Sequence, residues 1–308
     1  MTREPPTHPG SASTAFPPRA VSVEGPARQC DADARAAHSG ARPGQAGFSL
    51  VELLIVVGIV GLLASILLPP LGQARERARA AVCGSNARQL VVANLQYAGE
   101  NGGLLVAGAP RMRTENLRRW HGVRDSVAQA FVPQRGPLAT YLGSDGAVRY
   151  CPSFIAASYA GGAAAFERGC GGYGYNQAYL GRVMDRATPQ SNFRVVSDLV
   201  GVSLERVRRP AETLMFADTA LAATAGGVIE YSFAEPRFHP EYLRQRARPD
   251  PSLHFRHALA ATAAWSDGHV SPQRRTLTWQ SGLYEGDASA AGLGWFGASD
   301  DNGLFDLD

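Results

Sequence analysis

The sequence predicts an α+β protein, in which a long N-terminal helix, transmembrane in its first half, packs against a C-terminal antiparallel β-sheet head. Three observations predict this fold. The run Leu50–Leu68 is apolar and contains one charged residue, Glu52. Apolar positions at helical spacing continue beyond it as far as Tyr97. Short strand-like runs then replace the helical pattern. We therefore expect one helix over residues 48–98 and a globular head over 99–308.

The segment before the helix, residues 1–47, is expected to be a disordered leader. It is rich in proline, has no apolar periodicity, and lacks the apolar core of a secretory signal. Arg35 and Arg42 lie close to the apolar run, which favours keeping this end of the chain in the cytoplasm. The head is then expected on the opposite side of the membrane.

The run Leu50–Leu68 is long enough to cross a bilayer. The alternative, a buried core helix, is disfavoured because no polar face recurs at helical spacing. Pro69 and Pro70 end the run. They should kink the helix rather than stop it, because an apolar stripe resumes at Leu71. The membrane segment is therefore expected to reach to about residue 70.

The head should contain an antiparallel sheet that covers the half of the helix outside the membrane. Glycine, proline and charged clusters separate its expected strands. The glycine-rich stretch 161–174 is expected to be a loop, and it lacks the basic partners of a phosphate-binding loop. The expected strands cover residues 146–150, 193–198, 213–217, 227–233, 261–266 and 276–279.

Charge and cysteine content exclude some classes of function. A net charge of +3 is too small to argue for a nucleic-acid partner. The four cysteines form no Cys-x-x-Cys pair and so give no zinc pattern. If the head is exported, we expect a disulfide between Cys151 and Cys170, with Cys83 left on the helix. The sequence leaves this connectivity open.

The residues from Gly47 through Phe48 to Glu52 resemble the processing site of type IV prepilins and type II secretion pseudopilins. The resemblance implies that a prepilin peptidase/methyltransferase cuts after Gly47 and methylates Phe48. It also implies that Glu52 pairs with the N-terminus of a neighbouring subunit during filament assembly. A carboxylate near hydrocarbon costs roughly 2.5 to 3.5 kcal/mol, so such a partner makes physical sense. Other pilin-like subunits and the lipid bilayer are the further partners implied.

A second resemblance lies towards the C-terminus, where His257 precedes Asp267 and Gly268 in an H-x(9)-D-G pattern. This resembles the motif of the prepilin-type processing-associated H-x(9)-D-G proteins, as do the residues around Cys83 and Cys151. In a structural interpretation, Asp267-Gly268 forms a type I′ hairpin turn, and His257 bonds a loop carbonyl or the Asp267 carboxylate. In a functional interpretation, a metal binds between four side chains. These are His254, His257, Asp267 and His269.

The sequence favours a pilin-like filament subunit of the cytoplasmic membrane that is not itself an enzyme. The alternative is a membrane-anchored extracytoplasmic metal-binding protein or enzyme that uses His257 and Asp267. A plain single-pass anchor is a third possibility. The acidic tail 299–308 has enough oxygen ligands for calcium, and major pseudopilins are known for a calcium loop in the head. The EF-hand spacing is absent, however, and the sequence favours a solvated acidic terminus.

Overall fold

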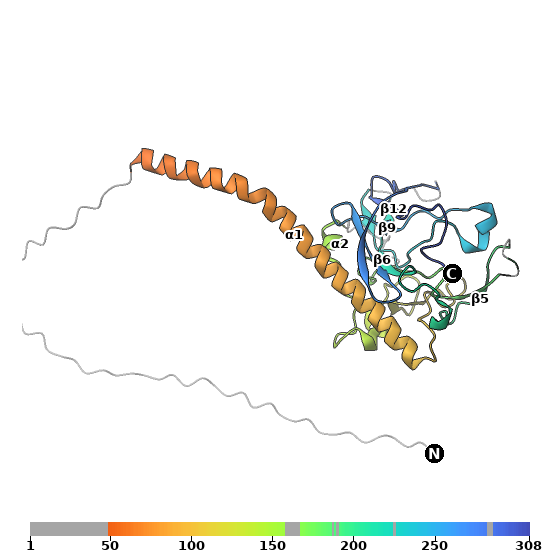
Figure 1. Cartoon of the computed structure of the whole chain (residues 1–308). Coiled ribbons are helices and arrows are strands. Elements are labelled where there is room, and N and C mark those ends of the chain that lie inside the picture. The colour runs from red at the N-terminus through yellow and green to blue at the C-terminus, as the bar shows by residue number, and fades with distance from the viewer. Residues whose placement is uncertain (1–48, 158–166, 187, 189–190, 224–225, 282–285) are drawn as a thin grey trace, which may run out of the picture. The chain divides into compact units, whose positions relative to one another are not determined.

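The computed structural model describes residues 49–157, 167–186, 188, 191–223, 226–281 and 286–308 (Figure 1). It falls into two compact parts, Met1–Ile55 and Val56–Asp308, and each is described by itself. The predicted leader and the predicted cut between Gly47 and Phe48 lie outside the described residues.

Helix α1, Leu50–Glu100, runs without a break through Pro69 and Pro70, as the sequence predicts. Large apolar side chains from Val56 to Leu71 are about half exposed or more. Beyond them, α1 buries a face that includes Cys83, Ala87, Leu90 and Val91. These positions recur at the three- and four-residue spacing of one helical stripe, so the second half of α1 packs on the head while the first half does not.

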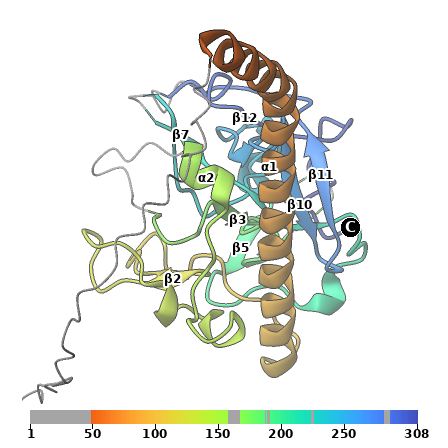
Figure 2. The ribbon, with the colours of Figure 1, turned by 90° about the vertical axis from the view of Figure 1, so that its left-hand side faces the viewer.

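The main sheet of the head has four strands in the order β11-β10-β6-β3, and all of its pairings are antiparallel. Figure 2 shows α1 lying across this sheet. The core between them joins Leu90 and Val91 of the helix to Tyr173 and Phe216 of the sheet. The α+β class is therefore observed. The strands are β3 Tyr173–Tyr175, β6 Leu214–Asp218, β10 Ala260–Trp265 and β11 Val270–Arg274.

Smaller elements surround this core. Four two-stranded sheets pair β1 Arg118–Arg119 with β2 Gly122–Val123, β4 Val183–Asp185 with β5 Arg194–Ser197, β7 Leu221–Ala222 with β8 Val228–Ile229, and β9 Leu253–His254 with β12 Leu293–Gly294. The short helix α2 covers Pro152–Ala157. Turns of 3-10 helix cover Pro133–Arg135, Ala139–Tyr141, Leu204–Arg206 and Pro240–Gln245.

Three predicted strands are confirmed as β5, β6 and β10, and the predicted run 227–233 contains only the short strand β8. The predicted strands 146–150 and 276–279 are wrong. In the second of these runs, Leu277 forms only an isolated bridge to Trp295.

Two strands of the main sheet were missed. Strand β3 begins inside the stretch predicted as a loop, and its Gly174 is needed because a Cβ there would collide with the Thr219 side chain. Strand β11 contains Pro272, which removes a backbone donor. The proline is tolerated because β11 is an edge strand of the sheet.

Candidate functional site

The start of α1 carries the first candidate site. The Glu52 backbone N–H donates to Ser49 Oγ at 3.1 Å, and the Ser49 backbone N–H donates to Glu52 Oε2 at 2.9 Å. This reciprocal pair is a capping box, with Ser49 as the N-cap. The one carboxylate of the apolar run therefore lies at the helix N-terminus, where the helix dipole favours negative charge.

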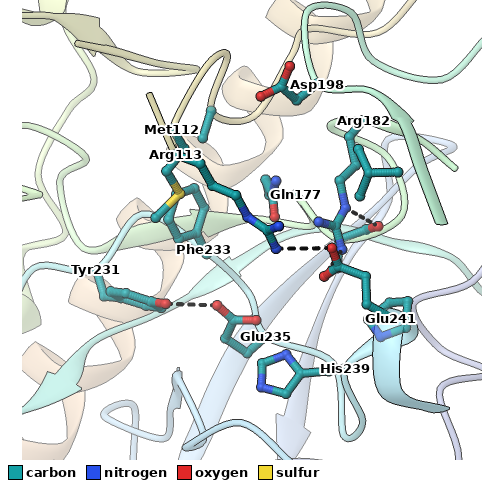
Figure 3. A pocket seen from close by; sticks show the side chains of 14 residues that line it. Met112, Arg113, Gln177, Arg182, Asp198, Tyr231, Phe233, Glu235, His239 and Glu241 are labelled. Atoms are coloured by element: carbon teal, nitrogen blue, oxygen red, sulfur yellow. Dashed lines mark hydrogen bonds and ion pairs between the residues drawn. The ribbon is translucent and has the colours of Figure 1, made fainter. Parts of the chain in front are cut away.

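A cavity of about 410 Å³ opens elsewhere in the head (Figure 3). Glu241 pairs with both Arg113 at 3.2 Å and Arg182 at 3.4 Å, while the Tyr231 hydroxyl donates to Glu235 at 2.7 Å. The charges of Arg113 and Arg182 are thus partly neutralised by Glu241. No sequence motif pointed to this cavity, because its lining comes from segments far apart in the chain. The apolar part of the lining is Ala109, Met112, Ala178, Val195, Phe233 and Pro240.

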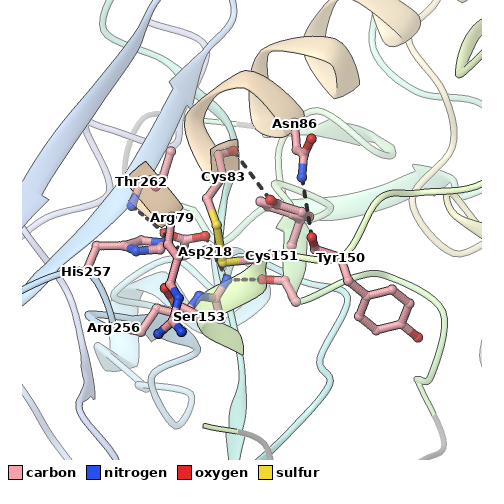
Figure 4. Close-up of a disulfide and its surroundings, with 12 residues drawn as sticks. Arg79, Cys83, Asn86, Tyr150, Cys151, Ser153, Asp218, Arg256, His257 and Thr262 are labelled. Carbon is pink, nitrogen blue, oxygen red and sulfur yellow. Dashed lines mark hydrogen bonds and ion pairs between the residues drawn. A yellow bond between two sulfur atoms is a disulfide. The ribbon is translucent and has the colours of Figure 1, made fainter. Parts of the chain in front are cut away.

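The predicted disulfide between Cys151 and Cys170 is wrong. Cys151 pairs instead with Cys83 of α1, with Cα atoms 5.0 Å apart (Figure 4). The segment that carries Cys151 lies on the buried face of α1, where Asn86 Nδ2 donates to the Tyr150 carbonyl at 3.4 Å. Cys170 is free and buried. Burial, with a contribution from the nearby Glu230 carboxylate, raises the pKa of the Cys170 thiol well above its ordinary value.

His257 lies directly against this disulfide (Figure 4). Its Nε2 is 3.5 Å from Cys151 Sγ and 3.3 Å from Asp218 Oδ2, and its Nδ1 is 3.2 Å from Glu76 Oε1. Asp218 belongs to β6 and Glu76 to α1. One imidazole thus joins the helix, the main sheet and the cysteine pair.

The other end of the H-x(9)-D-G pattern lies elsewhere. Asp267 Oδ1 is 2.7 Å from His269 Nδ1 and also accepts from the His269 backbone N–H. His257 precedes β10 and Asp267 follows it, so a strand of about 20 Å separates them. The structure therefore does not join His257 to the Asp267 carboxylate, which was one of the two partners expected for it.

The turn prediction also needs correction. In the turn from β10 to β11, Gly268 has a left-handed backbone with φ 94°, while the residues before it do not, so this is not a type I′ turn. The type I′ turn lies directly after His257 instead. There Ala258 has φ 50° and Leu259 has φ 67°, and His257 and Ala260 exchange both backbone hydrogen bonds. This two-residue turn fixes the position from which His257 reaches the disulfide.

Asp218 holds the surrounding polar network together. Arg256 Nη2 lies 2.7 Å from Asp218 Oδ1, and the Thr262 backbone N–H donates to Asp218 Oδ2 at 2.7 Å. His254 Nδ1 lies 3.1 Å from Arg256 Nη1. Burial and the charge of Arg256 lower the pKa of His254 to about 3, which keeps this imidazole neutral at ordinary pH.

The four predicted metal ligands thus separate into two places, with His254 and His257 near Asp218 and with Asp267 and His269 beyond β10. Among the residues that the structure describes, a different set converges. The ligand atoms of Cys83, Cys151 and His257 all lie within 4.8 Å of one another, and all three side chains are buried.

The acidic tail is partly engaged by cations of the protein itself. Asp300 pairs with Arg248, Arg246 and Arg237, and these contacts lower the pKa of the Asp300 carboxyl. Asn302 is buried and donates to the Phe238 carbonyl and the Tyr179 hydroxyl. Calcium binding by this tail stays a prediction.

Comparison with known proteins finds a match at the start of α1. Residues 42–68 match the family model of the prokaryotic N-terminal methylation motif, which includes the predicted cut and the first part of α1. Within the described residues, α1 is long and apolar enough to cross a membrane. Together these findings support a relationship to type IV pilin-like proteins. No curated protein and no solved structure matches the chain.

Proposed function

We propose that the chain is a pilin-like subunit that prepilin peptidase cuts between Gly47 and Phe48 and methylates at Phe48. The mature subunit is held in the cytoplasmic membrane by α1 and is assembled through α1 into a type IV pilus or a type II secretion pseudopilus. The observation that carries this proposal is the methylation motif, which leads directly into a helix with an exposed apolar first half.

The exposed part of α1 needs an apolar partner. From Val56 to Leu71 the large side chains of α1 are exposed, and soluble proteins rarely leave such a continuous apolar surface in water. A bilayer covers it in the monomer, and neighbouring α1 helices cover it in a filament. The same surface therefore serves first as an anchor and then as an assembly interface.

Glu52 distinguishes such a subunit from a simple anchor. Its carboxylate lies at the start of an apolar run, where it bonds only the Ser49 cap among the described residues. In the proposed mature protein, the methylated ammonium of Phe48 in a neighbouring subunit lies close enough to balance its charge. Two charges that are each costly in lipid become tolerable as a hydrogen-bonded pair.

The second half of α1 is joined to the head at two points. The Cys83–Cys151 disulfide and the Glu76–His257 hydrogen bond both connect α1 to the head. A subunit that is pulled out of the membrane by its helix must carry its head with it, so a covalent tie at this junction suits extraction. A disulfide also agrees with an extracytoplasmic head, since thiols are kept reduced in the cytoplasm. In this proposal the chain is a substrate of the peptidase and has no catalytic role.

Mass measurement of the N-terminus tests the proposal. The full chain is produced together with a prepilin peptidase, and its mature N-terminus is determined by mass spectrometry. We expect a chain that begins at Phe48 and carries one added methyl group. Gly47→Leu should block the cut, while Ala46→Leu, one residue further from the cut, should leave it intact. Normal maturation of the Gly47→Leu chain would contradict the proposal.

A further inference from the structure

The geometry points to a zinc site in the dithiol form of the protein, built from Cys83, Cys151 and His257. It differs from the metal site predicted from the sequence, with which it shares only His257. It does not depend on the proposed filament function.

The distances fit a tetrahedral ion. For bond lengths of about 2.3 Å to sulfur and about 2.0–2.1 Å to nitrogen, tetrahedral angles give about 3.5 Å between N and S. His257 Nε2 lies 3.5 Å from Cys151 Sγ. The ligand atoms of all three residues lie within 4.8 Å of one another. In the dithiol form the two sulfurs need only separate to about 3.8 Å.

A second layer of contacts orients these ligands. Glu76 Oε1 lies beside His257 Nδ1 at 3.2 Å, which holds the proton on Nδ1 and leaves Nε2 facing Cys151 and Asp218. A carboxylate behind a histidine is the usual arrangement around protein-bound zinc. The Asp218 carboxylate lies beside the same imidazole, with Oδ2 3.3 Å from Nε2, and Arg256 and the Thr262 N–H hold its two oxygens.

The charges also suit a divalent cation. Two thiolates neutralise Zn²⁺, while the neighbouring carboxylates of Asp218 and Glu76 are paired with Arg256 and Arg79. Cys83, Cys151 and His257 are buried, so the ion has three protein ligands, and its fourth position is left to water. Zinc and the disulfide are thus alternative cross-links between α1 and the head.

The test uses the full chain, synthesised in vitro into detergent micelles with tris(2-carboxyethyl)phosphine under argon so that the thiols never oxidise. After zinc is added and the excess is removed by gel filtration, we expect about one Zn²⁺ per chain. With Co²⁺ in its place, we expect thiolate-to-cobalt charge-transfer absorption and the d–d bands of a tetrahedral site. The oxidised protein should retain neither metal. Wild-type protein without the charge-transfer band would overturn the proposal, whatever the variants do.

Variants locate the ion. Cys83→Ser and His257→Ala should lose it, and Glu76→Gln should weaken zinc binding by about 10- to 100-fold. Cys170→Ser, which changes another buried cysteine, and Asp267→Asn, which changes the other end of the motif, should retain it. Retention of zinc by both Cys83→Ser and His257→Ala would place the ion elsewhere in the chain and would also overturn the proposal.

Discussion

The two halves of α1 share one regular backbone but have opposite surroundings. Before Pro69 the apolar side chains are exposed, and after Pro70 a single face is buried against the head and fastened by Cys83. In the proposed function the first half gains its stability from partners outside the chain, while the second half packs on partners inside it. Changes in the first half should therefore affect assembly, and changes in the second should affect the stability of the head.

The largest effect is expected at Glu52. Glu52→Ala should leave membrane insertion and cleavage intact but should abolish or strongly reduce assembly, because the N-terminal ammonium of a neighbour would enter lipid unpaired. Loss of one half of such a pair costs on the order of 3 to 5 kcal/mol at each contact. The measurement is the yield of cross-linked oligomer relative to mature monomer.

Two variants separate the charge of Glu52 from its capping role. Glu52→Gln keeps the shape and a hydrogen-bonding oxygen but should assemble as poorly as Glu52→Ala. Ser49→Ala removes the cap, at a cost of about 1 kcal/mol, and should still assemble. Wild-type assembly of Glu52→Ala would show that the pairing argument is wrong.

The next largest effect is expected on the stability of the head, when Cys83 in the second half of α1 is replaced. Its disulfide spans a sequence separation of 68 residues, so Cys83→Ser should lower the free energy of unfolding by about 4 kcal/mol in the chain-entropy model. Denaturant unfolding of the oxidised protein measures this. Cys170→Ser, which breaks no disulfide, is the matched control and should cost less. An equal loss in the two variants would count against the model.

A smaller effect is expected on the stability of the head as the pH is lowered. The pKa of His254 is lowered to about 3 by burial and by Arg256, whereas the unfolded chain has an ordinary histidine pKa of about 6.5. Below about pH 6.5 the unfolded state binds a proton that the folded state does not, so the head should lose stability as the pH falls towards 3. We expect roughly 2 kcal/mol of this loss between about pH 6.5 and pH 5. His254→Gln should show a shallower slope in pH-dependent unfolding, and an unchanged slope would contradict the assignment.

The smallest effect is expected at the turn after His257. Ala258 and Leu259 both have left-handed backbones, which cost non-glycine residues roughly 1–2 kcal/mol each. Replacing this pair with Asn-Gly, the preferred sequence for a type I′ turn, should raise the free energy of unfolding by about 1 kcal/mol. Thermal unfolding measures the gain. The same Asn-Gly pair at Ser266-Asp267, where neither backbone is left-handed, should give no gain.

The long helix could be predicted because its signals are local. Its apolar run and its stripe lie within one continuous stretch of sequence. The stripe also held a clue to the correct disulfide, since Cys83 lies four residues before Ala87 and seven before Leu90, on the face that α1 buries. The prediction instead joined Cys151 to Cys170, the cysteine nearest in sequence, and did not use the position of Cys83 on the buried face of α1.

The partners of His257 could not be predicted. Glu76 and Asp218 are far from it in sequence, and only the folded sheet and helix bring the three together. The H-x(9)-D-G motif suggested Asp267 as the partner of His257, but strand β10 lies between the two residues. Strands β3 and β11 were hidden for a different reason, since Gly174 and Pro272 disfavour a strand in isolation and are tolerated only by close packing and by an edge position.

The disulfide also sets how far the molecule can stretch. If tension enters through α1 and leaves through the C-terminal part of the head, force passes directly from Cys83 to Cys151. The loop between them, with its sequence separation of 68 residues, then stays slack even after the head has unfolded. About 230 Å of contour length is withheld from extension in this way. A filament of such subunits would have a hard limit to its elongation for as long as its disulfides remain oxidised.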